Sequence, residues 1–187
     1  MAVAKRKKRF FEVEMPVIKK NTHLFAYEKK ELEGRIIKYD LTRLLRGKNI
    51  VLDLKVILDG EKITSTPTGF ILLQAFIKRM IRKGTDYVED SFSTDCRNAR
   101  ITIKPFLITR RKVSRRIKNA VSKKAREEII KWAGTKNYEE LFDDCFKNNI
   151  QKELSIKIKK IYPLSLCEIR HLKIEKIINK KEEAKKE

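Results

Sequence analysis

The chain has 187 residues, of which 46 are Lys or Arg and 25 are Asp or Glu, so its formal net charge is +21. This length suggests one domain with extensions, and a hydrophobic content of 41% is enough for a core, which excludes disorder of the whole chain. No apolar run approaches the roughly 18 residues that span a bilayer, which excludes a membrane-embedded protein. A polyanionic partner best explains the surplus of positive charge, and nucleic acid is the first candidate.

The cysteines and the beginning of the sequence bear on location. Cys96, Cys145 and Cys167 are widely spaced and form no CxxC or other metal-ligand pattern, so we expect reduced thiols with a structural role. The opening MAVAKRKKRFF is basic but is followed by no apolar segment or cleavage site, which does not fit a secretory signal. These features predict a cytosolic protein.

Two charged ends flank the predicted domain. The unbroken basic run at residues 5–9 has no apolar partner, and we expect residues 1–9 to form a flexible basic arm. The mixture of Lys and Glu after residue 178 predicts a solvated tail over residues 179–187. A single domain is therefore expected over residues 10–178.

Strands dominate the first part of this domain. Aromatic and β-branched residues predict an extended segment over residues 10–15 and strands over residues 34–41 and 50–60. The dipeptide Asp59-Gly60 predicts a turn, and residues 61–66 are expected to return as the second strand of a hairpin.

The middle of the chain is predicted to form one helix and a second hairpin. Apolar residues from Phe70 to Ile81 recur at the helical period, and Thr66 or Thr68 is a candidate cap for that helix. Residues 86–94 and 99–109 then favour two paired strands.

Helices are predicted for much of the second half. The spacing of apolar residues predicts a long helix over residues 110–132 that stops at Gly134, and a shorter helix capped by Asn137. Residues 149–161 fit both a strand and a helix, and we favour the helix; residues 167–174 form a final strand candidate. The order of elements predicts an α+β fold in which a small antiparallel, β-barrel-like sheet is flanked by helices.

The most informative local feature is the stretch from Cys96 to Arg126, which contains 12 Lys or Arg and no Asp or Glu. On the long helix these cations are expected away from the apolar stripe of Val113, Ile117 and Val121, facing solvent or a polyanion. A solvated basic face is the simpler alternative. The candidate RNA-binding residues of this stretch and of the arm are Lys5, Arg6, Lys7, Lys8, Arg9, Arg97, Arg100, Lys104, Arg110, Arg111, Lys112, Arg115, Arg116, Lys118, Lys123 and Lys124.

The sequence indicates phosphate binding and no catalysis. The guanidinium fork of Arg suits phosphate, whereas no aromatic RRM signature, KH-type loop or paired Cys/His finger for reading bases is present. No nucleophile with its base, P-loop or metal cluster is visible, so no enzyme activity, cofactor or metal is expected. Cys167 and His171 would share one face of a strand but supply only two ligands. Trp132 and Phe10 are candidates for stacking on bases, although Trp132 fits the core better.

Several segments in order resemble a known family. These are GRIIKYDL after a charged loop, ARITIKPFLITRRKVSRRI, the helix ending AREEIIKWAG and, most specific, KKIYPLSLCEIRHLKI. Together they resemble the S3Ae family of small-subunit ribosomal proteins of archaea and eukaryotes over roughly residues 10–174. The sequence departs from the family at FFEV, where Trp-Tyr is usual, and lacks the long eukaryotic C-terminal extension, which favours an archaeal-type member.

The resemblance implies a structural protein without catalytic activity. It implies binding to small-subunit rRNA on the platform near the mRNA exit, beside neighbouring ribosomal proteins, in the cytoplasmic ribosome. Contact with mRNA is left open, and no membrane binding or homo-oligomer is expected. The alternatives are an RNA-processing or RNA-modifying enzyme and a free-standing nucleic-acid-binding protein.

Overall fold

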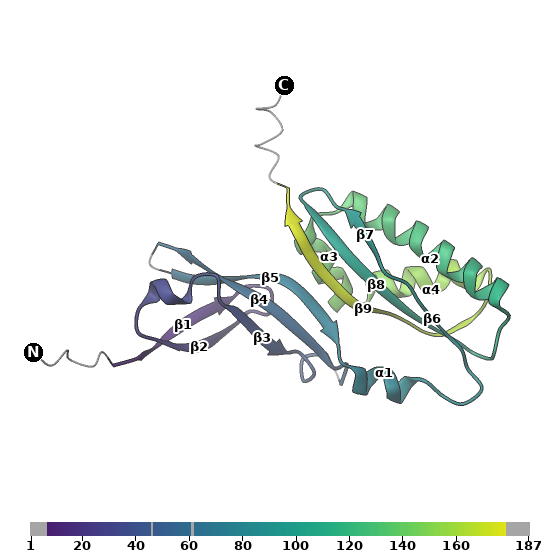
Figure 1. The fold of residues 1–187 in the computed structure, drawn as a ribbon, viewed down its shortest axis with the longest axis horizontal. Helices are drawn as coiled ribbons and strands as arrows, with labels where there is room; N and C mark the ends of the chain where they lie inside the picture. Colours follow the sequence, from purple (N-terminus) through teal and green to yellow (C-terminus); the bar gives the residue numbers. More distant parts are fainter. Residues whose placement is uncertain (1–6, 46, 61, 179–187) are drawn as a thin grey trace, which may run out of the picture. The chain divides into compact units, whose positions relative to one another are not determined.

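The computed structural model describes residues 7–45, 47–60 and 62–178 (Figure 1). Within these residues the chain forms nine strands, four α-helices and one short 3-10 helix. The elements in chain order are β1 Arg9–Met15, β2 Lys20–Ala26, η1 Lys29–Leu32, β3 Ile36–Asp40, β4 Ile50–Asp59, β5 Lys62–Leu72, α1 Gln74–Met80, β6 Tyr87–Glu89, β7 Phe92–Asp95, β8 Ala99–Thr109, α2 Arg115–Thr135, α3 Tyr138–Phe146, α4 Asn149–Lys159 and β9 Leu164–Ile177.

The strands pair into one open sheet. Its main path runs β2-β1-β5-β9-β8-β6, while β3 pairs with β4, β4 with β5, and β7 with β8. The long pairs are antiparallel, whereas β1 and β5 meet in parallel at Glu14 and Thr64. The predicted α+β class is therefore confirmed, and the sheet is open rather than closed into a barrel.

The chain divides into two compact units. Of the described residues, the first comprises those up to Tyr39 and those in Leu52–Thr68, and the second comprises those in Asp40–Val51 and those from Gly69 onward. The expected single domain over residues 10–178 stays a prediction. Arg9, the last residue of the expected arm, already belongs to β1, while residues 1–6 and the expected tail over residues 179–187 lie outside the described residues.

The first unit is built on the predicted strands. Alternation along β1 and β4 turns Val13 and Val56 inward, where they pack with Ala26, Leu32 and Ile63. The segment before Gly34, expected as a loop, contains η1, because the fully buried Leu32 anchors it to this core. The predicted hairpin of β4 and β5 is confirmed.

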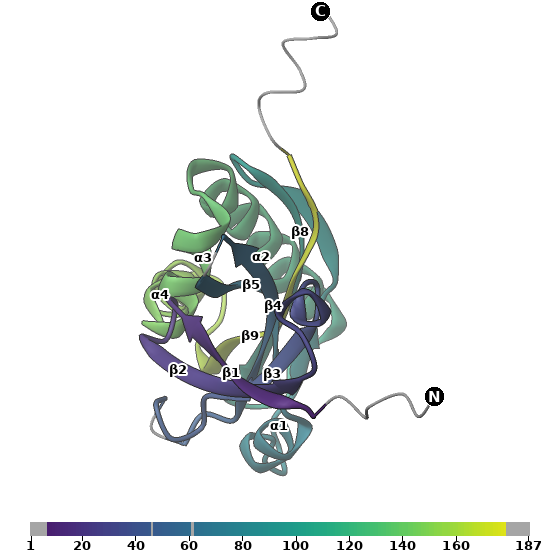
Figure 2. The same cartoon turned by 90° about the vertical axis from the view of Figure 1, so that its left-hand side faces the viewer.

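The second unit places helices against a sheet. Strands β8 and β9 pair over most of their length, and α2, α3 and α4 lie on one side of them, as Figures 1 and 2 show. Ile101 and Ile103 of β8 are fully buried, as are Val121 and Ile129 of α2. The predicted hairpin over residues 86–109 is confirmed, with its first strand divided into β6 and β7.

The helix predicted from Thr66 or Thr68 to Ile81 is wrong in its first half. Strand β5 continues to Leu72, and only the seven residues of α1 are helical. The run of Thr, Pro and Gly in β5 disfavours a helix, and burial there alternates as in a strand. Gly69 also fits a close pairing with β9, because a Cβ at that position would lie 2.8 Å from the Leu172 carbonyl oxygen.

The later helices are confirmed with one shift. Helix α2 begins at Arg115, so residues 110–114 precede it, and it continues past Gly134 to Thr135. Asn137 precedes α3 as predicted, where the Glu140 carboxylate accepts a hydrogen bond from its N–H at 3.3 Å. The ambiguous segment forms the helix α4, and the final strand candidate lies within β9.

Candidate nucleic-acid interface

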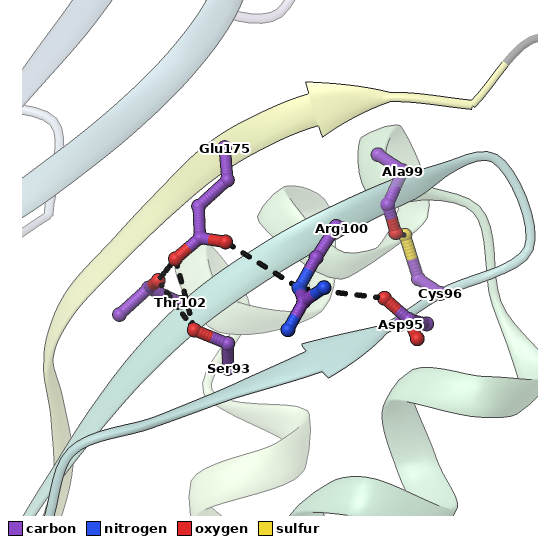
Figure 3. Close-up of polar contacts among 7 residues, drawn as sticks. All are labelled: Ser93, Asp95, Cys96, Ala99, Arg100, Thr102 and Glu175. Atoms are coloured by element: carbon purple, nitrogen blue, oxygen red, sulfur yellow. Dashed lines mark hydrogen bonds and ion pairs between the residues drawn. The ribbon is translucent and has the colours of Figure 1, made fainter.

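The predicted basic residues differ in whether a carboxylate lies beside them. Arg100 is the first paired one, with its Nε 3.5 Å from Glu175 and 3.9 Å from Asp95. Figure 3 shows this network on β7, β8 and β9, where the Glu175 carboxylate also accepts hydrogen bonds from Ser93 at 2.9 Å and from Thr102. The hydrogen bonds from Thr102 and Ser93 lower the pKa of Glu175. Arg100 is therefore partly neutralised by the fold.

The second half of α2 is paired in the same way. Arg126 donates two hydrogen bonds, of 2.7 and 3.0 Å, to the Asp90 carboxylate. Partial burial alone would raise the pKa of Asp90, but these hydrogen bonds help to lower it below its usual value. Lys124 and Lys157 of α4 contact the Glu128 carboxylate at 3.0 and 2.8 Å. These contacts join α2 to α4 and to the residue after β6, and the charge of these cations is balanced within the fold.

A carboxylate also fixes the connection between β8 and α2. Asp86 accepts a hydrogen bond from the Val113 N–H at 3.0 Å and lies 3.1 Å from the Lys118 ammonium. Both contacts lower the pKa of Asp86, the backbone hydrogen bond most. The Thr109 hydroxyl lies 2.9 and 2.7 Å from the Asp86 and Arg111 carbonyl oxygens and can donate its one hydrogen to either of them. The backbone of residues 110–114 is thus held in place.

This held segment and the first turn of α2 present a concentration of cations without ion pairs among the described residues, which we call the open cluster. All five of its side chains are exposed, and none has an ion pair within residues 7–45, 47–60 and 62–178. The first turn of α2 contains no acidic residue. The members of the open cluster are Arg110, Arg111, Lys112, Arg115 and Arg116.

The expected helical position of Lys112 is wrong, because Lys112 precedes α2. The shift gathers the cluster at one end of the helix, where the backbone N–H groups add positive potential. Arg115 and Arg116 then occupy the first two helical positions. Positive side chains at the positive N-terminal end of a helix disfavour folding. A bound anion would offset this cost, so the arrangement is typical of an anion-binding site.

Three further predicted residues, Arg97, Lys104 and Lys123, are exposed and have no ion pair in the described part of the chain. Lys104 lines a hollow of about 580 Å³ together with Arg170, whose guanidinium lies 2.9 Å from Glu89.

One described residue of the arm, Lys8, lies over aromatic rings to which the sequence assigned no role. Lys7, Lys8 and Arg9 are exposed, and the Lys8 ammonium lies over the rings of Phe25 and Tyr27. Lys5 and Arg6 lie outside the described residues. Of the two stacking candidates from the sequence, Phe10 is exposed and Trp132 is buried. The strand pairing that brings Phe25 beside Phe10 is the signal that the sequence lacked.

The thiols of the second unit are buried. Burial raises the pKa of the Cys167 thiol to about 12 and that of Cys145 further still. Trp132 is also buried, as expected. The expectation that Cys167 and His171 share a face is wrong, because a β-bulge at Arg170 shifts the register: Cys167 lines a hollow with α4, and His171 the hollow with Lys104.

Neither a cluster of metal ligands nor a membrane-spanning helix is found among the described residues. They hold no group of three or more His, Cys, Asp or Glu side chains arranged to bind a metal ion. No helix among them has the length and apolar character needed to cross a membrane.

Comparisons with known proteins show which family the sequence belongs to. The model of the Ribosomal S3Ae family matches residues 4–177, and the chain belongs to this family of ribosomal proteins. A relative from Nanoarchaeum equitans, the small ribosomal subunit protein eS1, is 26% identical over 180 residues, covering 91% of this chain and 90% of the relative. Proteins of the same name from Desulfurococcus amylolyticus and Saccharolobus islandicus are 26% and 24% identical, covering 80% and 81% of this chain and 72% and 76% of their own lengths.

Proposed function

We propose that this chain is a structural protein of the small ribosomal subunit and binds rRNA mainly through phosphate contacts. The family membership and the shared name of the archaeal relatives support the assignment to the small subunit. The sequence resemblance adds a position on the platform near the mRNA exit, in the cytoplasmic ribosome and beside other small-subunit proteins. No catalytic role, cofactor or homo-oligomer is part of this proposal.

The open cluster carries the RNA-binding part of the proposal. Four of its five members are arginines, whose guanidinium groups remain charged and offer parallel N–H donors to phosphate oxygens. A surface that only kept the protein soluble would need no group of cations without ion pairs on a segment held by hydrogen bonds. Because Asp86 and Thr109 hold the backbone, less conformational entropy is lost on binding.

Such contacts fix the orientation of a protein on RNA and carry little sequence information. We therefore expect the isolated protein to prefer structured RNA over a particular base sequence. In the assembled subunit, specificity would follow from the shape of the folded rRNA and from neighbouring proteins.

The salt dependence of RNA binding tests this proposal. If about six to ten phosphates are neutralised, the slope of log affinity against log salt concentration is roughly −4 to −9. Filter binding of a structured rRNA fragment at several salt concentrations measures the slope. A flat dependence would contradict the electrostatic account.

Sedimentation tests the assignment to the small subunit. The native protein should remain with 30S particles after a high-salt wash of purified ribosomes, because assembly buries its contacts among rRNA and proteins. A free-standing nucleic-acid-binding protein would instead be released by the wash and appear in the supernatant.

A further inference from the structure

An exposed group of aromatic rings lies at one end of the β1–β2 hairpin in the first unit. Phe10 and Phe25 are direct cross-strand partners, and their ring centroids are 4.8 Å apart at an interplanar angle of 38°. The two residues are 72% and 47% exposed, and Tyr27, just after β2, is 43% exposed. Burial in the core therefore does not account for these rings.

Two cations, Lys8 and Arg35, lie near the same rings. The Lys8 ammonium lies 5.7 Å from the centroid of Phe25 and 5.1 Å from that of Tyr27, within the range of a cation–π interaction. Arg35 donates a hydrogen bond to the Phe25 carbonyl oxygen at 3.4 Å, which places its guanidinium beside β2. Aromatic faces and positive charge thus occur together at this end.

The other end of the same hairpin face differs in character. Alternation along β1 puts Glu12 and Glu14 on the face that carries Phe10, and Glu12 accepts a hydrogen bond from Asn21 at 2.8 Å. Along the paired strands of this face, the rings therefore lie at the end near Lys8 and Arg35, and Glu12 and Glu14 at the other end; the Glu31 carboxylate, which follows β2, contacts the Tyr27 backbone. This segregation favours an anionic occupant over a generally apolar one.

The fold holds the rings in place from behind. Val13 and Ala26 turn to the opposite face of the hairpin and pack with Leu32 in the core of the first unit. The Tyr27 N–H donates to the Glu31 carboxylate at 3.0 Å, which fixes the turn after β2. A preorganised surface loses little conformational entropy when a ligand stacks on it.

We propose that Phe10, Phe25 and Tyr27 form a stacking platform for unpaired nucleobases of RNA, with Lys8 and Arg35 beside the sugar-phosphate chain. The inference rests on the proposed RNA-binding function and adds a second site with a different chemistry. Flat π-faces accept any base, and neighbouring cations attract the phosphates, which is the combination that single-stranded RNA requires. An acidic protein segment would use the cations but not the ring faces.

A paired substitution tests the platform. The double variant Phe10→Leu with Phe25→Leu keeps apolar area and charge but removes two ring faces. Binding to single-stranded oligouridine of about 12 nucleotides should weaken roughly 5-fold or more per lost stack, while binding to an RNA duplex should hardly change. Circular dichroism and thermal unfolding should match the unmodified protein, because both side chains are exposed.

Two controls separate the possible readings. Ile36→Ala removes another exposed apolar side chain of the first unit without removing a ring, and should leave oligouridine binding unchanged. Phe10→Trp keeps a stacking face, so its affinity should be retained and its indole fluorescence quenched by bound oligouridine, whereas the native Trp132 is buried.

Either of two results would overturn the platform. Unchanged oligouridine binding by the double Leu variant would do so. That result would leave the proposed binding of structured RNA untouched, because the open cluster carries that proposal and is tested separately. Normal RNA binding by that variant combined with loss of a protein neighbour from assembled subunits would show a protein-docking surface instead.

Discussion

The open cluster and the second half of α2 have the same kind of side chain and opposite surroundings. Arg115 and Arg116 begin the helix without a carboxylate partner among the described residues, whereas Lys124 and Arg126, two turns or more further on, contact Glu128 and Asp90. The comparison shows that formal charge does not identify a binding surface. The presence of a carboxylate within reach decides whether a cation serves the fold or remains available.

The two regions should therefore respond differently to the same chemical change. Removing charge from the open cluster should weaken RNA binding, because phosphate contacts are lost. It should leave the free energy of unfolding unchanged, because no ion pair is lost. Removing charge from the paired region should affect the free energy of unfolding, because a carboxylate would lose its partner. Four substitutions or titrations can break or refine this division.

The largest effect is expected for replacing Arg110, Arg111, Arg115 and Arg116 together by Gln. If each guanidinium contacts a phosphate, the affinity for structured RNA falls roughly 100-fold at physiological salt, and the salt slope becomes shallower by about 3. Gln is compatible with a helix, so thermal unfolding should be unchanged. Filter binding and calorimetry measure the two quantities. A loss of stability as large as the loss of binding would place these residues in an internal network.

The matched change in the paired region is Arg126→Gln. It removes both hydrogen bonds to Asp90, whose side chain is 18% exposed, and a cation over the Phe92 ring at 5.1 Å. We expect the free energy of unfolding in urea to fall by about 1 kcal/mol, because the pair is only partly screened by solvent. RNA affinity should stay within about twofold of the unmodified protein. A large loss of affinity with unchanged stability would move Arg126 into the binding surface.

The decrease of the free energy of unfolding at acidic pH tests the same division at Glu128. Hydrogen bonds from Lys157 and Lys124 lower its pKa from 4.5 to about 2 in the folded chain. Since the folded pKa lies below the unfolded value, the ionised carboxylate stabilises the fold above about pH 4.5, and this contribution is lost as the pH falls towards 2. Urea midpoints across this range should therefore decline. In Glu128→Gln the decline should be smaller, and an unchanged decline would assign it to other carboxylates.

Alternation and one-sided composition made much of the fold predictable. In β4, Leu52, Leu54 and Val56 alternate in the sequence with Asp53 and Lys55, which favours a strand, and the three apolar side chains are buried. The segment from Thr66 to Leu72 was mistaken for helix because its apolar residues also fit a 3.6 period. Pairing with β9, a contact distant in sequence, decides its structure.

The candidate site was predictable only in part. The absence of Asp and Glu from residues 96–126 revealed the basic stretch directly. It did not reveal that Asp86 and Asp90, which precede that stretch, fold back onto Lys118 and Arg126. Nor did it reveal that Phe25 lies opposite Phe10, because register depends on how the strands pair. Both omissions are tertiary contacts that composition does not encode.

The smallest effect is expected for moving one cation from the paired to the open state. In Asp86→Asn the amide oxygen can still accept the Val113 hydrogen bond, while Lys118 loses its anionic partner and becomes available beside the open cluster. The salt slope for RNA binding should then steepen by about 0.7 to 0.9, with a gain of a few-fold in affinity. Glu127→Gln is the matched control: it changes the net charge equally, but Lys124 keeps Glu128 at 3.0 Å. The slope should steepen only in the first variant, because a phosphate contact requires a free cation and not merely a higher total charge. A shallower slope in Asp86→Asn would instead mean that the carboxylate's charge, and not only its hydrogen-bonding oxygen, holds residues 110–114 in the geometry that RNA binding needs.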